Sequence, residues 1–352
     1  MATMKKTRGL ACLVSVLAAC IFAVSCEKTT DPSYEHMVGS TDFELASFLA
    51  VSQLIDLEAK GVAYPDKFIV KWLIPEVYED TLTGRLLTIR TPEEPGFLNV
   101  TVLTNSSGYF EQEISKTSIV IDSVKSLTGR VFNARRITDP RDGQKYYTTY
   151  AGKLEWFAEN LKWAGAGVCY AECDVLQPVM GRLYTWNEAT GGEEGSGLGG
   201  GPQGACPEGW SVPTAEDWED LAKALNEDVA VPFLSNWAGL GQKLTVEAYL
   251  NGMKMWPISP DNNKSNTVFW NAIPAGYNLR TSNIYRDFMS YGMWWSSARR
   301  NADRAYYRYI YFDADYCGVN YASVNDAAFS VRCVKLIGDL DPLPIGGALD
   351  AQ

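Results

Sequence analysis

Residues 206–225 read CPEGWSVPTAEDWEDLAKAL and contain a clear helix start. Thr214 can accept hydrogen bonds from the free amides of a first helical turn, and Asp217 lies three residues later, near the positive helix end. Trp218, Leu221 and Leu225 then recur at helical spacing and form one apolar face. The sequence therefore predicts a helix that begins after Thr214 and runs through Leu225.

Extended segments surround this helix start. A turn at residues 139–143 leads into an extended segment at 144–150. Residues 305–312 alternate Tyr307, Tyr309 and Tyr311 with Tyr306, Arg308, Ile310 and Phe312, and residues 329–333 alternate Phe329, Val331 and Cys333, expected to point inward, with Ser330 and Arg332. One or two helices followed by several antiparallel strands indicate an α+β domain over residues 131–337.

The preceding region differs in composition. Residues 41–131 hold one tryptophan, Trp72, and no cysteine, which places a boundary near residues 130–139. Short segments rich in Val, Ile, Leu and Thr lie between turn residues at 68–74, 86–89, 98–103, 109–114 and 118–121. They predict a small, mainly-β, sandwich-like domain over residues 41–130. Residues 42–60 partly fit a helical stripe and would pack on this domain as a helix or pair as another strand.

The first residues form a targeting segment. Lys5, Lys6 and Arg8 precede an apolar run at residues 9–24, which is shorter than a spanning helix of about 20 residues. Small residues lead into Cys26, which resembles a lipobox cysteine. We expect a signal peptide at 1–25, a lipid on Cys26 and a flexible tether at 26–40.

Two alternatives to this leader exist. Residues 17–20 end in Cys20 and match the short lipobox pattern more closely, but cleavage there would leave the apolar residues 21–24 on the mature chain. The other alternative is an ordinary secretory signal in which the cysteine occurs by chance. Because charge and a polar, proline-containing segment follow Cys26 directly, we favour Cys26.

Charge and histidine content restrict the function. Removing the three positive charges of the leader takes the net charge from −11 to −14, which argues against a nucleic-acid partner and against electrostatic adhesion to anionic lipid. The only histidine is His36, inside the expected tether. The folded part therefore lacks histidine-based catalysis and histidine-ligated zinc. With no convincing catalytic constellation elsewhere, we do not expect an enzyme.

Six blocks appear in order in the second region. They are residues 156–161 (WFAENL), 181–186 (GRLYTW), 206–213 (CPEGWSVP), 273–277 (IPAGY), 294–297 (WWSS) and 329–334 (FSVRCV). This set resembles the Fibrobacter succinogenes major paralogous domain family, over residues 131–337. The resemblance implies a C-type-lectin-like fold in a bacterial surface lipoprotein, and it implies little about activity.

The resemblance also bears on the cysteines. It implies a Cys206–Cys333 disulfide, which would close a loop of over a hundred residues and contribute about 3–5 kcal/mol. Cys169 and Cys173 lie closer together than the family pattern has them, and a local bridge would need their Cα atoms within about 6 Å. The exported chain has an odd number of remaining cysteines, so at least one thiol is left over, and Cys317 is the expected spare.

Ligand-binding candidates lie outside the six blocks, since the block tryptophans are expected to form the core. Aromatic candidates for sugar stacking are Trp237, Trp256, Tyr285, Tyr291 and Tyr316. Arg299, Arg300, Arg304 and Arg308 form either a solvated loop or an anchor for acidic sugars. Asp313 and Asp315, like residues 261–263, are weak calcium candidates, and we expect no other cofactor.

These observations favour an outer-membrane lipoprotein, exposed at the cell surface, that binds a glycan or protein ligand. It would contact the membrane only through its lipid, and residues 338–352 would form a disordered tail. The first alternative is a non-enzymatic subunit of a surface or pilus-like assembly. A second, less favoured, is a cysteine-dependent oxidase of the formylglycine-generating type, in which Cys317 would be the reactive thiol with a second free cysteine nearby.

Overall fold

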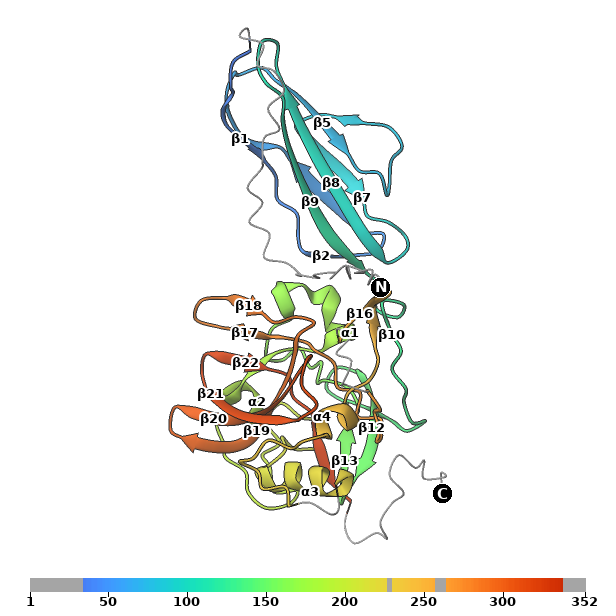
Figure 1. The fold of residues 1–352 in the computed structure, drawn as a ribbon, viewed down its shortest axis with the longest axis vertical. Coiled ribbons are helices and arrows are strands. Elements are labelled where there is room, and N and C mark those ends of the chain that lie inside the picture. The colour runs from blue at the N-terminus through green and yellow to red at the C-terminus, as the bar shows by residue number, and fades with distance from the viewer. Residues whose placement is uncertain (1–33, 227–229, 257–263, 338–352) are drawn as a thin grey trace, which may run out of the picture.

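The computed structural model describes residues 34–226, 230–256 and 264–337, which form two parts arranged end to end (Figure 1). The predicted signal peptide, Cys26 and the predicted tail at 338–352 lie outside the described residues. Within the described ranges, no helix combines the length and apolarity needed to cross a membrane. The predicted tether at 26–40 overlaps the fold at its end, because residues 38–40 lie in the first strand.

The first part is built from nine strands in three sheets. They are β1 (Val38–Asp42), β2 (Phe48–Ala50), β3 (Leu54–Glu58), β4 (Lys60–Tyr64), β5 (Ile69–Leu73), β6 (Leu82–Thr83), β7 (Leu86–Arg90), β8 (Gly96–Asn105) and β9 (Gln112–Ile121). A five-stranded sheet has the order β2-β9-β8-β5-β6, β3 pairs with β7, and β1 pairs with β4. The mainly-β character expected for this region is therefore found.

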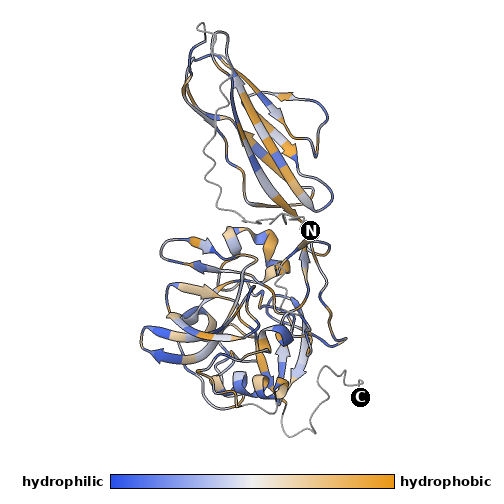
Figure 2. Ribbon diagram, in the orientation of Figure 1, coloured by the Kyte–Doolittle hydropathy of each residue, from blue (hydrophilic) through white to orange (hydrophobic). Residues whose placement is uncertain are grey.

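Alternation along β8 explains how this part forms a core. Leu98, Val100 and Val102 are fully buried, while the residues between them face outward. They share one buried cluster with Trp72 of β5, whose indole N–H donates to the carbonyl of Gly84 at 2.8 Å. Figure 2 shows apolar and polar residues alternating along these strands.

The helix considered for residues 42–60 does not form. These residues make β2 and β3, and Ser52 between them has a φ of 56°, which no helix accommodates. Ile55 and Leu57 lie two residues apart and face the core from β3, so their spacing fits a strand as well as a helical stripe. The alternative of an additional paired strand is what the structure shows.

A shared apolar cluster joins the two parts. Phe48 and Ile121 of the first part pack in one buried cluster with Leu176, Val179 and Leu250 of the second. The short strand β10 (Leu127–Thr128) also pairs with β15 (Tyr249–Leu250).

The hairpin turn after β15 fastens this junction through one side chain. The Asn251 side-chain amide donates to the carbonyls of Gly96 and Val120 at 3.1 and 2.8 Å. The two parts are thus held by apolar packing and by hydrogen bonds.

The second part has many short elements. Its strands after β10 are β11 (Arg136–Thr138), β12 (Lys145–Ala151), β13 (Leu154–Phe157), β14 (Tyr184–Thr185), β15, β16 (Met253–Lys254), β17 (Tyr277–Leu279), β18 (Ile284–Arg286), β19 (Tyr291–Asn301), β20 (Arg304–Tyr311), β21 (Gly318–Ser323), β22 (Ala327–Phe329) and β23 (Val334–Leu336). Its helices are η1 (Tyr170–Glu172), η2 (Asp174–Leu176), α1 (Gln177–Met180), α2 (Trp186–Thr190), α3 (Ala215–Leu225) and α4 (Leu240–Leu244). The sheet orders are β11-β12-β13-β23, β14-β22-β17-β18, β19-β20-β21 and β10-β15-β16.

This arrangement overturns the predicted α+β, C-type-lectin-like fold. The second part is mostly β, divided among several small sheets, and α3 is the one described helix longer than five residues. Many of its strands, including β14, β15, β16, β17 and β22, have only two or three residues. Such strands are too short to show a periodicity, so the β content was underestimated.

The predicted secondary structure was nevertheless correct where the local sequence pattern was strong. Helix α3 begins after Thr214, whose hydroxyl accepts from the amide of Asp217 while the Asp217 carboxylate accepts from the amide of Thr214. Strands β12 and β20 occupy the segments predicted as extended. The strand predicted over 329–333 is wrong, because β22 ends at Phe329 and Ser330 and Arg332 are as buried as their neighbours.

Candidate functional site

The two tryptophans proposed as ligand-binding residues are buried. Trp237 is 3% exposed and Trp256 is fully buried. The backbone of Trp237 pairs with Cys317, and its indole N–H donates to Pro232. The Trp256 indole N–H donates to the carbonyl of Ala272. Both side chains belong to the core, so the proposal that they contact a ligand is wrong.

The arginines do not form a single basic anchor. Arg308 is fully buried, with its guanidinium 3.2 Å from the centroid of the Trp237 ring, and it donates to the carbonyls of Phe233 and Ser235. Burial lowers the pKa of Arg308 to about 10. It therefore stabilises the surrounding loop and cannot reach an external ligand.

The other three arginines divide between two rings. Arg299 stacks on Trp186 at 4.1 Å and donates to the carbonyls of Gly192 and Ala302. Arg300 and Arg304 lie over the Tyr321 ring, at 3.5 and 5.3 Å from its centroid. Of the four arginines, only Arg300 and Arg304 are exposed at the surface.

The disulfide implied by the family resemblance is present. Cys206 and Cys333 are bonded, with their Cα atoms 5.8 Å apart. The bridge considered between Cys169 and Cys173 is absent: both are free thiols, and Cys169 Sγ lies 3.2 Å from Nη1 of Arg182. Two residues between them, Ala171 and Glu172, have positive φ values, so the segment turns without joining the sulfurs.

Cys317 is a free thiol, as expected, but it has none of the features of a reactive one. Its side chain is buried in the core beside Trp237 and Arg308, and burial raises the pKa of Cys317 to about 11. A nucleophilic cysteine requires a lowered pKa and access to solvent. The other free thiols lie elsewhere: Cys173 packs against the apolar cluster at the junction, and buried Cys169 lies beside Arg182.

The calcium candidates are not assembled into a site. Asp313 and Asp315 are both exposed, and residues 261–263 lie outside the described residues. In the described ranges, no three His, Cys, Asp or Glu side chains gather closely enough to hold a metal ion.

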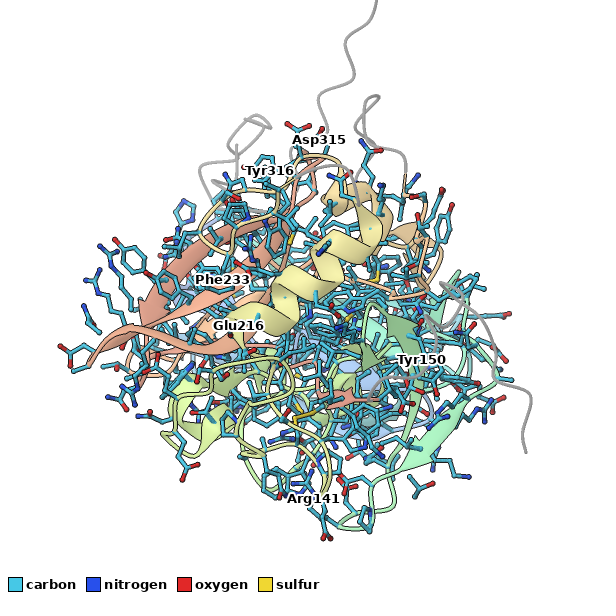
Figure 3. All side chains as sticks on the ribbon, turned by 90° about the horizontal axis from the view of Figure 1, so that it is seen from below. Arg141, Tyr150, Glu216, Phe233, Asp315 and Tyr316 are labelled. Atoms are coloured by element: carbon cyan, nitrogen blue, oxygen red, sulfur yellow. A yellow bond between two sulfur atoms is a disulfide. The ribbon has the colours of Figure 1, made fainter. Side chains whose placement is uncertain are left out.

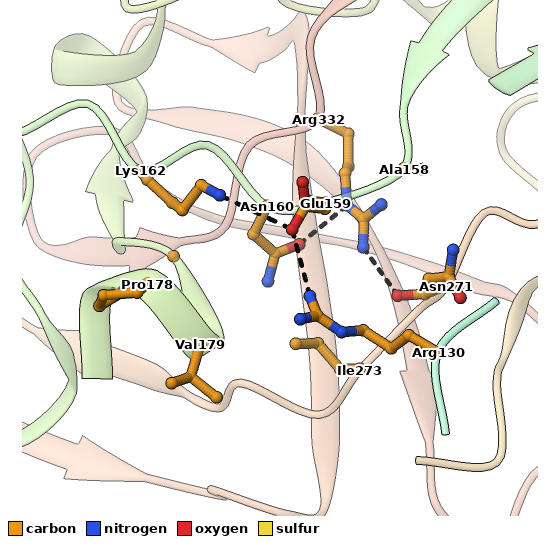
Figure 4. Close-up of a pocket in the computed structure, with 11 residues that line it drawn as sticks. Arg130, Ala158, Glu159, Asn160, Lys162, Pro178, Val179, Asn271, Ile273 and Arg332 are labelled. Atoms are coloured by element: carbon orange, nitrogen blue, oxygen red, sulfur yellow. Dashed lines mark hydrogen bonds and ion pairs between the residues drawn. The ribbon is translucent and has the colours of Figure 1, made fainter. Parts of the chain in front are cut away.

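A buried polar network lies where most of the six sequence blocks meet (Figure 4). The carboxamide oxygen of Asn160 accepts from Nε1 of Trp294 and Nε of Arg332, and the Asn160 amide donates to the carbonyl of Met180. The remaining Arg332 donors bind the carbonyls of Phe157, Trp270 and Asn271. A cavity of about 10 Å³ beside this network has room for one water-sized occupant.

A second concentration of side chains lies on one face of the β19-β20-β21 sheet. We call it the tyrosine face. It consists of six half-buried residues: Tyr291 of β19, Tyr307, Tyr309 and Tyr311 of β20, Tyr316 of the loop before β21, and Tyr277 of β17 in a different sheet. Tyr291 lies opposite Tyr311, and the buried Trp295 lies opposite Tyr307, so these side chains share one side of the sheet.

The rings of this face contact one another. The centroids of Tyr291 and Tyr311 are 4.4 Å apart, and those of Tyr309 and Tyr316 are 6.2 Å apart. Tyr277 and Tyr307 both contact Phe329, which lies beneath them with Trp295. Burial, and then a hydrogen bond with Tyr316, raises the pKa of Tyr309, and burial raises the pKa of Tyr307 to about 12.

Gly318 permits this arrangement. It lies opposite Tyr309, and a Cβ atom at residue 318 would come within 2.3 Å of the Tyr309 ring. The ring therefore lies flat across the backbone of β21, where only glycine leaves room. Tyr316, which sequence reasoning singled out, lies with Asp315 at one rim of the second part (Figure 3).

Most of the tyrosine face was not recognised from the sequence as one site. The alternation of Tyr307, Tyr309 and Tyr311 was visible, and Tyr291 and Tyr316 were proposed separately. These tyrosines form one surface because β19 pairs with β20, which brings Tyr291 opposite Tyr311.

Comparison with known proteins identifies the second part. A family model described as the Fibrobacter succinogenes major domain matches residues 133–335, which is more than half of the chain. No curated protein matches the chain.

Proposed function

The chain belongs to the Fibrobacter succinogenes major domain family, and from this we propose that it is a cell-envelope lipoprotein whose family domain binds a glycan. The lipid would be on Cys26 and the anchor in the outer membrane, with the domain exposed at the cell surface. The basic start, short apolar run and small residues before Cys26 support the anchor.

The tyrosine face is the observation that carries the proposal. Half-buried tyrosine rings offer a large, rigid area with a polar edge, at a low cost in conformational entropy. Flat apolar rings pair with the C–H faces of pyranoses, while phenolic hydroxyls can bond to sugar hydroxyls. None of the six side chains is charged, and exposed Asn320 lies opposite Tyr307 at the rim. A neutral polysaccharide fits these groups better than a charged polymer does.

The shape of the surface favours a long ligand over a small one. Sites for small molecules are concave and enclose most of the ligand. The rings of the tyrosine face instead lie on an open sheet. A surface depression of about 380 Å³ beside α3 has Glu219 and Asp220 in its lining, but these carboxylates already accept from the amides of Phe233 and Lys153.

We also propose that binding is not coupled to catalysis. The buried thiol of Cys317 is not activated, and the folded part lacks histidine apart from His36 near its start. The protein would then act by holding the cell, or a partner, to a polysaccharide.

A matched pair of double variants tests glycan binding. Tyr291→Ala with Tyr311→Ala removes two rings from the tyrosine face. Tyr306→Ala with Tyr321→Ala removes two rings that pair on the opposite side of the same sheet. The purified full chain and both variants would be applied to a glycan array and then titrated with any polysaccharide that binds.

Glycan binding predicts a loss of about tenfold or more for the first variant and little change for the second. Binding that is lost equally in both variants would contradict the assignment of the face. A chain that binds no glycan, but forms polymers or retains a dedicated partner in pulldowns, would support the alternative role as a subunit of a surface assembly.

A further inference from the structure

The cavity beside Asn160 has an excess of positive charge in its walls. Arg130, Lys162 and Arg332 line it, with Glu159 as the one carboxylate (Figure 4). Arg332 is fully buried, Lys162 is 7% exposed and Glu159 is 9% exposed. Three cations and one anion therefore occupy a largely buried region, with the Arg130 side chain 17% exposed, in a chain whose overall charge is negative.

Glu159 is already shared among several donors. Its Oε1 atom accepts from Nη1 of Arg130 at 3.2 Å and lies 3.6 Å from Nζ of Lys162, while Oε2 accepts from the amide of Tyr147. One carboxylate cannot balance three cations. The negative charge of Asp142 also attracts Lys162, but Asp142 is exposed to solvent.

Among the described residues Arg332 forms no ion pair, and Arg130 shares Glu159 with Lys162. Each guanidinium also lies over a ring, Arg332 at 4.3 Å from the centroid of Trp270 and Arg130 at 5.0 Å from that of Phe132. All the acceptors of Arg332 are neutral oxygens, from Asn160 and three backbone carbonyls. The Nε atom of Arg130 is buried and has no hydrogen-bond partner. Burial is the largest cause lowering the pKa of Arg130, Lys162 and Arg332, so the site disfavours the positive charges it contains.

We propose that this cavity binds a single small anion of the halide class, chloride being the one of biological abundance. The volume of about 10 Å³ admits one water-sized particle and excludes carboxylates, phosphate and sulfate, which leaves a monatomic anion as the candidate. A halide there would accept from Nε of Arg130 and reduce the charge excess of the surrounding residues.

The site would also fasten the segment that joins the two parts of the protein. Arg130 lies in that segment, directly before Val131, whose amide and carbonyl are both bound by the side chain of Asn271. Anion binding would therefore stabilise the junction as well as the second part.

Thermal unfolding of the purified full chain tests the site. The melting temperature would be measured in sodium chloride, bromide and gluconate at one ionic strength, so that general screening is the same in each. We expect a saturable rise in chloride and bromide but not in gluconate, of roughly 2–5 °C for each tenfold increase in halide above Kd.

Variants separate this site from other halide effects. Arg130→Gln should abolish the halide dependence, whereas Arg136→Gln, an exposed arginine outside the cavity lining, should preserve it. Should Arg130→Gln fail to fold, anomalous diffraction from crystals of the unaltered chain in bromide gives a second measurement. A bromide peak beside Arg130 Nε would support the proposal. Equal melting temperatures in all three salts, or a cavity that holds only water in bromide, would overturn it.

Discussion

Nε of Arg332 donates a hydrogen bond of 2.8 Å to the carboxamide oxygen of Asn160, a residue 172 positions earlier in the chain. The same oxygen accepts from Trp294. Asn160, Trp294 and Arg332 come from three of the six family blocks, so these blocks are united by a buried network rather than by an exposed site. In this network the family pattern therefore reports how the fold is held together.

Removing Asn160 should be costly because Arg332 would remain as a fully buried cation with a broken bond. We expect Asn160→Ala to lower the free energy of unfolding by about 2–4 kcal/mol. Urea unfolding followed by tryptophan fluorescence would measure it, with exposed Asn320→Ala as the control. An Asn160→Ala midpoint equal to that of the control would show that the network contributes little.

The Cys206–Cys333 disulfide should stabilise the second part by constraining its unfolded state. The bridge spans a sequence separation of 127 residues, for which chain entropy predicts about 3–5 kcal/mol. Cys206→Ala with Cys333→Ala should lower the free energy of unfolding by that amount. The comparison is made against the oxidised chain under the same denaturant, and an unchanged midpoint would refute the prediction.

Phe48 should couple the unfolding of the two parts. Its side chain belongs to the first part, yet it contacts Tyr170 and Phe288 of the second, at 6.4 and 5.4 Å between ring centroids. Phe48→Ala should cost about 2–4 kcal/mol and separate one unfolding transition into two, because the parts lose much of their shared core. Differential scanning calorimetry would resolve the transitions. A single transition in the variant would show that β10 and Asn251 suffice to hold the junction.

Some features of this structure could be predicted from the sequence and others could not. Helix α3 was found because its capping box and apolar face lie within a few consecutive residues. The burial of Trp237 could not be predicted in this way, because it depends on the pairing of its backbone with Cys317, far along the chain. Arg308 was misjudged for the same reason: on an alternating strand an arginine normally faces solvent, but here the loop at 231–240 folds over that face and supplies carbonyls to it. Contacts of this kind depend on tertiary structure and leave no local pattern.

Alkaline pH should destabilise the tyrosine face. Burial raises the folded-state pKa of Tyr307 to about 12, whereas an unfolded tyrosine titrates near 10. Its contribution is therefore fully present below pH 10 and is lost as the pH rises through 12, because the unfolded chain releases its proton first. Tyr307→Phe should reduce the loss of stability between pH 10 and 11.5 by about 1–2 kcal/mol. Urea titrations across this range would measure it, and a Tyr307→Phe profile equal to that of the unaltered chain would contradict the prediction.

Gly318→Ala should impair glycan binding without removing any ring. An added Cβ would meet the ring of Tyr309 at 2.3 Å, so the ring must leave the backbone of β21 and lose its contact with Tyr316. Because the ring is the free end of a side chain, it can move outward, and the chain should remain folded.

The matched control is Gly252→Ala, since a Cβ at residue 252 has nothing within 4 Å. Gly252 has a φ of 78°, so its replacement strains the backbone somewhat and provides a stringent test of folding. Glycan titration with circular dichroism should show reduced affinity for Gly318→Ala alone, with both variants folded. Unchanged affinity for Gly318→Ala would mean that the flat placement of Tyr309 is not required, and that the ligand rests on Tyr291 and Tyr311 instead.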